Sequence, residues 1–371
     1  MLTHPDLVTL YRSLRDAPVL SVYVDHSTRN PPDQRAWRVQ LERQLADIRR
    51  TIGNRGNTSR TSFDACVDRL EGEMAHLEAG VGAAGWAAFI SAGRVHAAHE
   101  LPIGAPTSAT WGTGPRIAPY FRSLKEQRPA VLVVGDARRA VIYHYRAAEL
   151  DRAAVVRAHR TVDRPEHMGT PARRGFHAPT RGTAGHDAAQ RALLEGRDRM
   201  IGEASARVLK LADPDAWILI GGSKRVAARL AEQLEPSAPH RVLQLESLDV
   251  HAGEADLAVF ARAGASQLRI MADELRLTGI VETAGAHGLA ATGAAATRTA
   301  LAHLAVRELY VTPRYVDEHA AAAEEIIRLA TDQDASVEVV SGRAAACLDQ
   351  HGGVAAAFRF RVARADGGAS P

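Results

Sequence analysis

The chain has 371 residues, a length that favours two or three domains over one. Hydrophobic residues make up 46% of the chain and charged residues 24%, a balance typical of proteins with buried cores. A formal net charge of +3 is too small to indicate a nucleic-acid binder by itself, and no apolar run reaches the length of a membrane span. The first residues have no signal-peptide pattern, and Cys66 and Cys347 are the only cysteines. We therefore expect a cytoplasmic protein without disulfides or membrane contact.

The basic residues are nearly all arginine, with lysine only at positions 125, 210 and 224. The planar guanidinium suits phosphate groups and base stacking. A genome rich in GC codons is the alternative cause, because it favours arginine and alanine throughout a chain.

The first 127 residues predict an α+β domain. An apolar, β-branched run indicates a strand at 18–25, and helical spacing of apolar residues indicates helices at 35–52 and 62–79. Strands are expected at 85–91 and 94–101. The stretch from Ala105 to Pro115 is rich in Gly, Pro, Ser and Thr and is predicted to be a loop.

The second region opens with a buried strand at 130–136 and its hairpin partner at 140–145. Residues 160–186 have no periodicity, which is typical of a functional or disordered segment. A helix is predicted from Ala188 to Leu211, followed by a buried strand, Trp217-Ile-Leu-Ile-Gly-Gly. Further helices at 223–234 and 253–276 complete an α/β unit.

The third region alternates helices and strands and so predicts an α/β sandwich. Helices are expected at 292–304, 318–331 and 343–350. Strands are expected at 309–313, 337–340 and 357–362, and the small polar tail from Ala363 is expected to be disordered.

Three segments of the third region carry a family resemblance. They are Val306-Arg-Glu-Leu-Tyr-Val, Ala335-Ser-Val-Glu-Val-Val and Gly352-Gly-Val-Ala-Ala-Ala-Phe-Arg-Phe. Their order and their amino-acid sequences resemble the C-terminal domain of the archaeal-eukaryotic class-one release factor and Pelota family, in which a glycine pair leads into the last strand. The chain is most similar to the bacterial branch of that family, of the hibernation-factor-like (Balon) type.

The resemblance implies an α/β multidomain fold with three parts. An N-terminal α+β domain is expected at 1–127, a ribonuclease H-like middle domain with its loop at 160–186 is expected at 128–272, and an L7Ae-like α/β sandwich is expected at 273–371. The first part matches nothing as clearly as the other two, and we interpret it as the variable domain of the bacterial branch.

The family's catalytic loop reads Gly-Gly-Gln-Ser-Ala-Gln-Arg, and its ungapped counterpart here is Gly185-His-Asp-Ala-Ala-Gln-Arg191. His186 replaces the second glycine and Asp187 replaces the glutamine. In the family, this loop helps water attack the ester between peptide and tRNA, a reaction that depends on positioning and on stabilising an oxyanion. The carboxylate of Asp187 opposes that charge and argues against peptide release, although Gln190 lies nearby. Asp187 followed by Gln190 also fits a helix capping box, which is a structural alternative.

Arginines crowd the same segment, and the resemblance favours RNA contact by Arg164, Arg173, Arg174, Arg181 and Arg191. A solvated loop is the alternative. His159, His167, His177 and His186 match no zinc spacing, so we expect no metal.

A phosphate loop at Gly221-Gly-Ser-Lys224 lacks the Walker spacing, and we interpret Ser223 as a helix N-cap instead. Asp25-His-Ser27 is interpreted as a surface turn rather than as catalytic. No cofactor is expected.

Three functions remain open. The resemblance implies a ribosome-associated factor of the hibernation or rescue kind that binds the A site, with the 70S ribosome, rRNA, tRNA and an elongation factor as its expected partners. An active peptidyl-tRNA ester hydrolase is the second possible function, although the altered catalytic loop argues against enzymatic activity. An RNA-binding adaptor that does not act on the ribosome is the third.

Overall fold

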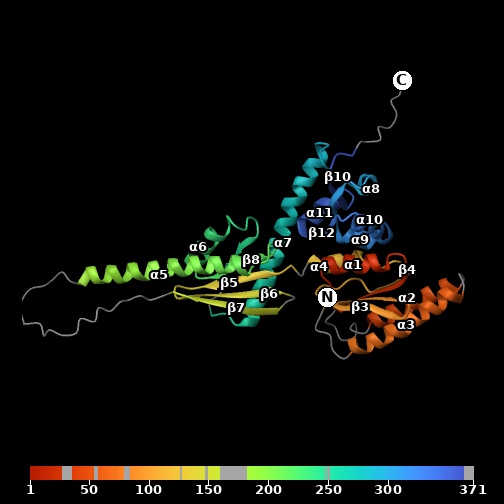
Figure 1. The fold of residues 1–371 in the computed structure, drawn as a ribbon, viewed down its shortest axis with the longest axis horizontal. Coiled ribbons are helices and arrows are strands. Elements are labelled where there is room, and N and C mark those ends of the chain that lie inside the picture. Colours follow the sequence, from red (N-terminus) through yellow and green to blue (C-terminus); the bar gives the residue numbers. More distant parts are fainter. Residues whose placement is uncertain are drawn as a thin grey trace, which may run out of the picture. The chain divides into compact units, whose positions relative to one another are not determined.

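The structure is a computed structural model that describes residues 1–26, 36–53, 57–78, 84–125, 128–146, 149–158, 182–246, 248 and 251–362. The side chains of residues 57–58, 76–78 and 182–189 are outside that description. The chain divides into two compact units (Figure 1). Unit 1 comprises Met1–Gln127 with Arg269–Pro371, and unit 2 comprises Arg128–Leu268. None of the helices in the described part of the chain combines the length and hydropathy that crossing a bilayer requires.

The N-terminal part of unit 1 is an antiparallel sheet with helices on both faces. The strand order is β3-β2-β1-β4. Its elements are α1 (His4–Leu14), β1 (Pro18–Asp25), α2 (Ala36–Gly53), α3 (Asn57–Glu78), β2 (Gly85–Ser91), β3 (Arg94–Leu101), β4 (Ser108–Thr113) and α4 (Ala118–Lys125). Helices α2 and α3 cover one face through a core that includes Leu41, Phe63 and Trp86.

Strand β4 corrects the loop predicted at 105–115. It pairs with β1 over its whole length, with Trp111 opposite Leu20. On its other side, the Gln44 side chain accepts a hydrogen bond from the Ala109 amide at 2.6 Å and donates one to the Thr107 carbonyl at 3.2 Å. The loop prediction is wrong because the small polar residues of this edge strand resemble those of a loop in composition.

The C-terminal part of unit 1 is an α/β sandwich around a mixed sheet of order β10-β13-β11-β12. Its elements are the second half of α7 (Glu254–Gly285), β10 (Ala290–Thr292), α8 (Ala294–Ala302), β11 (Val306–Val311), α9 (Pro313–Glu318), α10 (Ala320–Asp332), β12 (Ser336–Val339), α11 (Gly342–Gln350) and β13 (Val354–Phe358). The last strand follows the Gly352-Gly353 pair, in which both residues have positive φ angles of 88° and 75°. A Cβ on Gly353 would lie 2.8 Å from the Cβ of Tyr315. Packing therefore requires glycine at one of the positions that carry the family resemblance.

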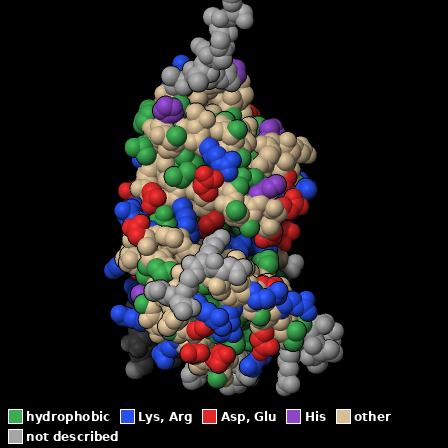
Figure 2. All heavy atoms as spheres, turned by 90° about the vertical axis from the view of Figure 1, so that its right-hand side faces the viewer, with side chains coloured by type: hydrophobic (Ala, Val, Ile, Leu, Met, Phe, Trp, Pro, Cys, Tyr) green, Lys and Arg blue, Asp and Glu red, His purple; other side chains and the backbone are tan. Residues whose placement is uncertain are grey.

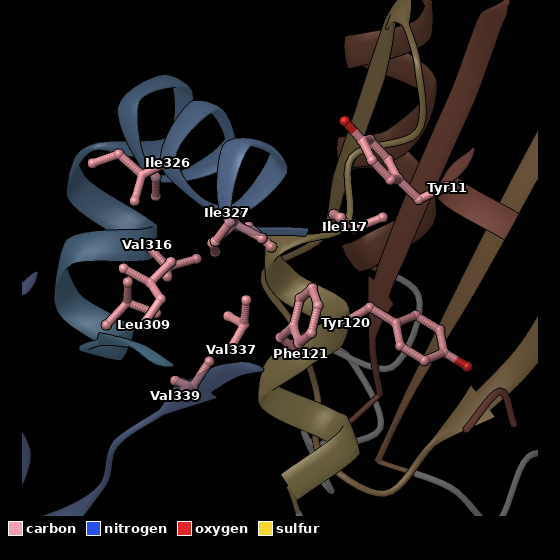
Figure 3. Packing of buried hydrophobic residues seen from close by; sticks show 14 of the residues in the cluster. Tyr11, Ile117, Tyr120, Phe121, Leu309, Val316, Ile326, Ile327, Val337 and Val339 are labelled. Atoms are coloured by element: carbon pink, nitrogen blue, oxygen red, sulfur yellow. The ribbon is translucent and has the colours of Figure 1, made fainter. Parts of the chain in front are cut away.

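One hydrophobic core joins the two parts of unit 1. Figure 3 shows Phe121 and Ile117 from the first part near Ile327 and Val337 from the second. Glu324 of α10 adds a polar link, because its carboxylate accepts hydrogen bonds from the amides of Ile117 at 2.9 Å and Ala118 at 3.0 Å, at the start of α4. The two parts thus bury apolar surface against each other.

Unit 2 is built on a five-stranded sheet of order β7-β6-β5-β8-β9. Strands β5, β6 and β7 are antiparallel neighbours, whereas β8 and β9 run parallel to β5, as in a ribonuclease H-like sheet. The elements are β5 (Ala130–Gly135), β6 (Arg139–Arg146), β7 (Glu149–Arg157), α5 (Gly182–Leu211), β8 (Trp217–Gly222), α6 (Lys224–Leu234), β9 (Val242–Gln244) and the first half of α7. With three sheets and flanking helices among the described residues, the structure confirms the α/β multidomain class. The boundaries at 127 and 272 stay a prediction.

Candidate nucleic-acid interface

The centre of unit 2 is the parallel pair of β5 and β8. Each of these strands ends in glycine. Gly135 lies opposite Gly222 in the register, and Gly222 has a φ of 103°. A Cβ there would lie 2.2 Å from the Gly135 carbonyl oxygen, so only glycine fits. Ser223 occupies the predicted N-cap position of α6, but its side chain makes no capping hydrogen bond. The glycine pair therefore serves the turn from strand to helix.

Helix α5 is fixed to this sheet by its second half. Met200, Ile201, Ala204 and Val208 are all buried in the core of unit 2. The Ser205 hydroxyl donates a hydrogen bond to the Gln233 side chain of α6 at 2.9 Å. The spacing of these residues places them on one face of the helix, so this half of α5 is held by both the sheet and α6.

The first half of α5 extends past the ends of β5, β6 and β7 (Figure 1). Gln190 and Arg191 are exposed, and Leu193 is 51% exposed. A helix rises about 1.5 Å per residue, so Asp187 precedes Met200 by roughly 20 Å along the axis. Helix α5 is therefore an arm that carries its first turns away from the core of unit 2.

The predicted catalytic-loop residues lie on this arm. Helix α5 begins at Gly182, so Gly185, His186 and Asp187 belong to its first two turns. The sequence predicted a helix start near Ala188 and a loop that continued to residue 186, and that start is wrong. The capping-box interpretation of Asp187 is wrong for the same reason, because an N-cap precedes the first helical residue and Asp187 lies five residues after it.

The helical backbone restricts what this position can do chemically. In an α-helix only the first four amides lack an intrahelical acceptor. With a start at Gly182, the Asp187 amide is the sixth and donates within the helix. This amide is consequently committed to the helix rather than offered to a substrate oxyanion.

Most of the predicted RNA-contacting arginines are outside the described residues. This holds for Arg164, Arg173, Arg174 and Arg181, and also for His159, His167 and His177. Arg191 is described and exposed on the arm. Among the side chains that the structure describes, no cluster of three or more His, Cys, Asp or Glu residues could hold a metal ion.

The structure adds a group of basic residues that the sequence interpretation missed. A groove of about 270 Å³ between α5 and α6 is lined by Leu194, Arg197, Asp198, Arg225, Ala228 and Arg229. The arginines come from segments about 30 residues apart, so no local motif could reveal them.

Comparison with known proteins leaves the family of the chain unassigned by sequence. No family model and no curated protein matches it. Solved structures do show similarity. Archaeoglobus fulgidus Pelota aligns over 74% of this chain and 79% of its own length, with 13% identity and a TM-score of 0.39.

Two further structures show similarity at the same level. S. cerevisiae Dom34, described as a translation termination-like factor in RNA quality control that interacts with Hbs1, aligns over 74% of this chain and 77% of its own, with 10% identity and a TM-score of 0.46. A chain in a model of ribosome-bound archaeal Pelota and ABCE1 aligns over 97% of this chain and 95% of its own, with 15% identity and a TM-score of 0.43. At such identities, and with TM-scores below 0.5, the function has to be inferred from the residues of this chain.

Proposed function

We propose that this chain is a ribosome-associated translation factor of the hibernation or rescue kind, which occupies the A site without releasing peptide. The observation that carries the proposal is the arm of α5. It holds Gly185, His186 and Asp187, the counterpart of the family's catalytic loop, on the helical turns that extend past the ends of β5, β6 and β7. A factor that reaches into a deep ribosomal site needs such an extension.

The scaffold that supports the arm retains the features that the resemblance depends on. The glycine pair at 221–222 ends β8, and the pair at 352–353 precedes β13. Space or backbone conformation requires glycine at Gly222 and Gly353. An intact scaffold, combined with altered residues at positions 186 and 187 at the tip of the arm, supports ribosome binding without peptide release.

The tip itself argues against peptide release. His186 adds a Cβ and a ring at a position where the family has glycine, and Asp187 adds a carboxylate where it has glutamine. A carboxylate near a developing oxyanion raises the energy of that transition state. The commitment of the Asp187 amide to the helix points the same way.

The stretch from β7 to the first turns of the arm supplies the charge for RNA contact. Residues 151–191 contain eight arginines, against four acidic residues. Arginine contacts to phosphate release counterions, so they give affinity that falls with salt. We propose the rRNA of the 70S ribosome as the main partner and tRNA as a second one. Delivery by an elongation factor is a further proposal that rests on the resemblance alone.

Co-sedimentation tests the proposal directly. Purified protein is layered with 70S ribosomes, either vacant or carrying peptidyl-tRNA in the P site, on sucrose cushions at 50 and 200 mM salt. We expect stoichiometric pelleting at low salt, and competition by tRNA in the A site. Absence from the pellet at low salt, or pelleting that A-site tRNA leaves unchanged, contradicts the proposal and favours the adaptor function.

One observation favours a second function, that of a peptidyl-tRNA ester hydrolase. Gln190 is exposed and lies one turn after Asp187, so an amide side chain is still available on the arm. A peptide-release assay separates this function from binding alone.

A further inference from the structure

The groove between α5 and α6 contains an arginine that is enclosed but weakly partnered. The Arg197 side chain is only 15% exposed. Its closest carboxylate is that of Asp198, at 3.9 Å from Nε, which is too long for a hydrogen bond. No hydrogen-bond acceptor for this guanidinium lies among the residues that the structure describes. Its nitrogens are not among the fully buried atoms of the described residues, so the guanidinium is still open to an anion from outside the protein.

Two arginines of α6 face the same groove. Arg225 and Arg229 line it together with Arg197, and Leu194, Asp198 and Ala228 complete the lining. Arg229 also pairs with Glu232 at 2.8 Å, but both side chains are more than half exposed. Such exposed pairs contribute little to stability, so an incoming anion can replace Glu232 as the partner.

The two helical segments that border this groove carry a net positive charge. Residues 190–211 and 224–234 carry eight basic and four acidic residues, a net charge of +4, whereas the full chain has a net charge of +3. The face of the molecule in Figure 2 instead shows acidic and basic side chains interspersed. Surface potential of one sign attracts polyanions and orients their approach.

We infer that the α5–α6 groove is a second RNA-binding site, in which Arg197, Arg225 and Arg229 hold the phosphodiester backbone of a single strand. The inference extends the proposed function, since it assigns to the factor an RNA contact separate from the tip of the arm. Asp187 and Arg197 are ten residues apart on one helix, which is about 15 Å along its axis. One strand several nucleotides long spans both places.

The test uses the full-length chain and a fluorescein-labelled twelve-nucleotide oligouridylate. The groove variant is Arg225→Gln with Arg229→Gln, and Arg197→Gln is measured separately. The matched control is Arg199→Gln with Arg207→Gln, which removes the same charge from exposed positions on the other side of α5. Dissociation constants are measured by fluorescence anisotropy at several salt concentrations, and thermal melts confirm that each variant is folded.

We expect the groove variant to bind the oligonucleotide at least about tenfold more weakly than wild type, because charge-assisted phosphate contacts are lost. Its salt dependence should fall by roughly 1.4 in slope, since each contact with a single strand contributes about 0.7. Arg197→Gln should weaken binding as well, and the control should change affinity less than about threefold. Equal losses in the groove variant and the control overturn the inference, as does an unchanged affinity of the groove variant.

A competitor distinguishes RNA from acidic protein. Polyglutamate at the same charge concentration should displace little oligouridylate, and full displacement overturns the assignment to RNA. Ribosome binding separates this inference from the proposed function. If wild type fails to pellet with ribosomes while oligouridylate binding still depends on Arg225 and Arg229, only the proposed function fails. If wild type pellets and the groove variant keeps its oligouridylate affinity, only the inference fails.

Discussion

Lys125 and Asp273, which are 148 residues apart in the chain, bring Nζ and Oδ1 to 2.6 Å inside unit 1. Their side chains are only 13% and 5% exposed. Nζ also donates to the Val339 carbonyl at 2.9 Å, and Asp273 accepts from the Ser341 amide at 2.9 Å. The pair therefore ties the end of α4 to α7 and to the end of β12. It links the first and the last part of the chain at one buried point.

Replacing Lys125 with Met should lower the free energy of unfolding of unit 1 by about 3 kcal/mol. The change leaves the Asp273 carboxylate buried without its cation, and such broken pairs typically cost about 3–5 kcal/mol. Urea melts followed by circular dichroism measure the effect. Lys210→Met, at an exposed lysine of α5, is the matched control and should stay within about 0.5 kcal/mol of wild type. A loss below about 1 kcal/mol for Lys125→Met would show that the pair contributes little.

Replacing Gly222 with Ala should destabilise unit 2 by at least about 2 kcal/mol. Its φ of 103° is unfavourable for any side chain, and the new Cβ would lie 2.2 Å from the Gly135 carbonyl oxygen. Gly202→Ala is the control, because no atom lies within 4 Å of its added Cβ. Inside helix α5 that change should be neutral or stabilise by up to about 1 kcal/mol. Equal effects of the two variants in a thermal melt would contradict the requirement for glycine.

Alkaline pH should destabilise unit 1 through Tyr120. Burial raises the pKa of Tyr120 to about 12, and its hydroxyl accepts a hydrogen bond from the Leu2 amide at 2.8 Å. A phenol whose pKa is raised in the folded state stabilises fully below its unfolded pKa of about 10, and this stability is lost as pH rises towards 12. Urea melts between pH 9 and 11.5, with phenolate absorbance as a second signal, follow the loss.

The variant Tyr120→Phe removes this titration and should make the decline with pH shallower. It should also cost about 1 kcal/mol at neutral pH, because the Leu2 amide loses its acceptor. A decline of unchanged steepness in the variant would place the alkaline transition on other tyrosines, such as Tyr11, whose pKa burial also raises to about 12.

Part of the fold could be predicted from the sequence because several central strands are continuous apolar runs. The strands β5 and β8 lie where Val131 to Val134 and Ile218 to Ile220 indicated them, since their side chains are buried on both faces of the sheet. Helix α4 was missed because its eight residues, which begin with Ala118-Pro119, are too few to show a period. Its position depends on contacts with α10 that lie far away in sequence.

The candidate site was predictable only in part. The resemblance located the counterpart of the catalytic loop but not its backbone, because Gly182 and Gly185 lower helix propensity and no apolar periodicity precedes Leu193. The groove was invisible for a different reason. Arg197 and Arg225 become neighbours only when α6 packs beside α5, and neither position has a pattern of its own.

Ribosome affinity should fall when the arginines that precede the arm are neutralised. The change is Arg173→Ala, Arg174→Ala and Arg181→Ala in one chain, and the expected cause is the loss of phosphate contacts. Co-sedimentation at several salt concentrations should show weaker binding and a smaller dependence on salt. The variant Arg43→Ala, Arg50→Ala and Arg69→Ala removes the same charge from unit 1 and serves as the control. If wild type and the first variant bind alike at every salt concentration, this segment makes no phosphate contacts.

The last prediction concerns catalysis, and we expect the wild-type chain to release little or no peptide from peptidyl-tRNA in the ribosomal P site. Loss of one well-placed oxyanion donor lowers rates by roughly 100- to 1,000-fold, and here the Asp187 amide is engaged in α5 while its side chain is a carboxylate. The informative comparison is with His186→Gly and Asp187→Gln together, which restores the family's Gly-Gly-Gln. We expect release to rise above wild type in this double variant, while co-sedimentation with 70S ribosomes stays unchanged. Robust release by wild type, at the rate of the double variant, would identify the protein as an enzyme, and Gln190→Ala would then test whether the exposed amide one turn later supplies the missing donor.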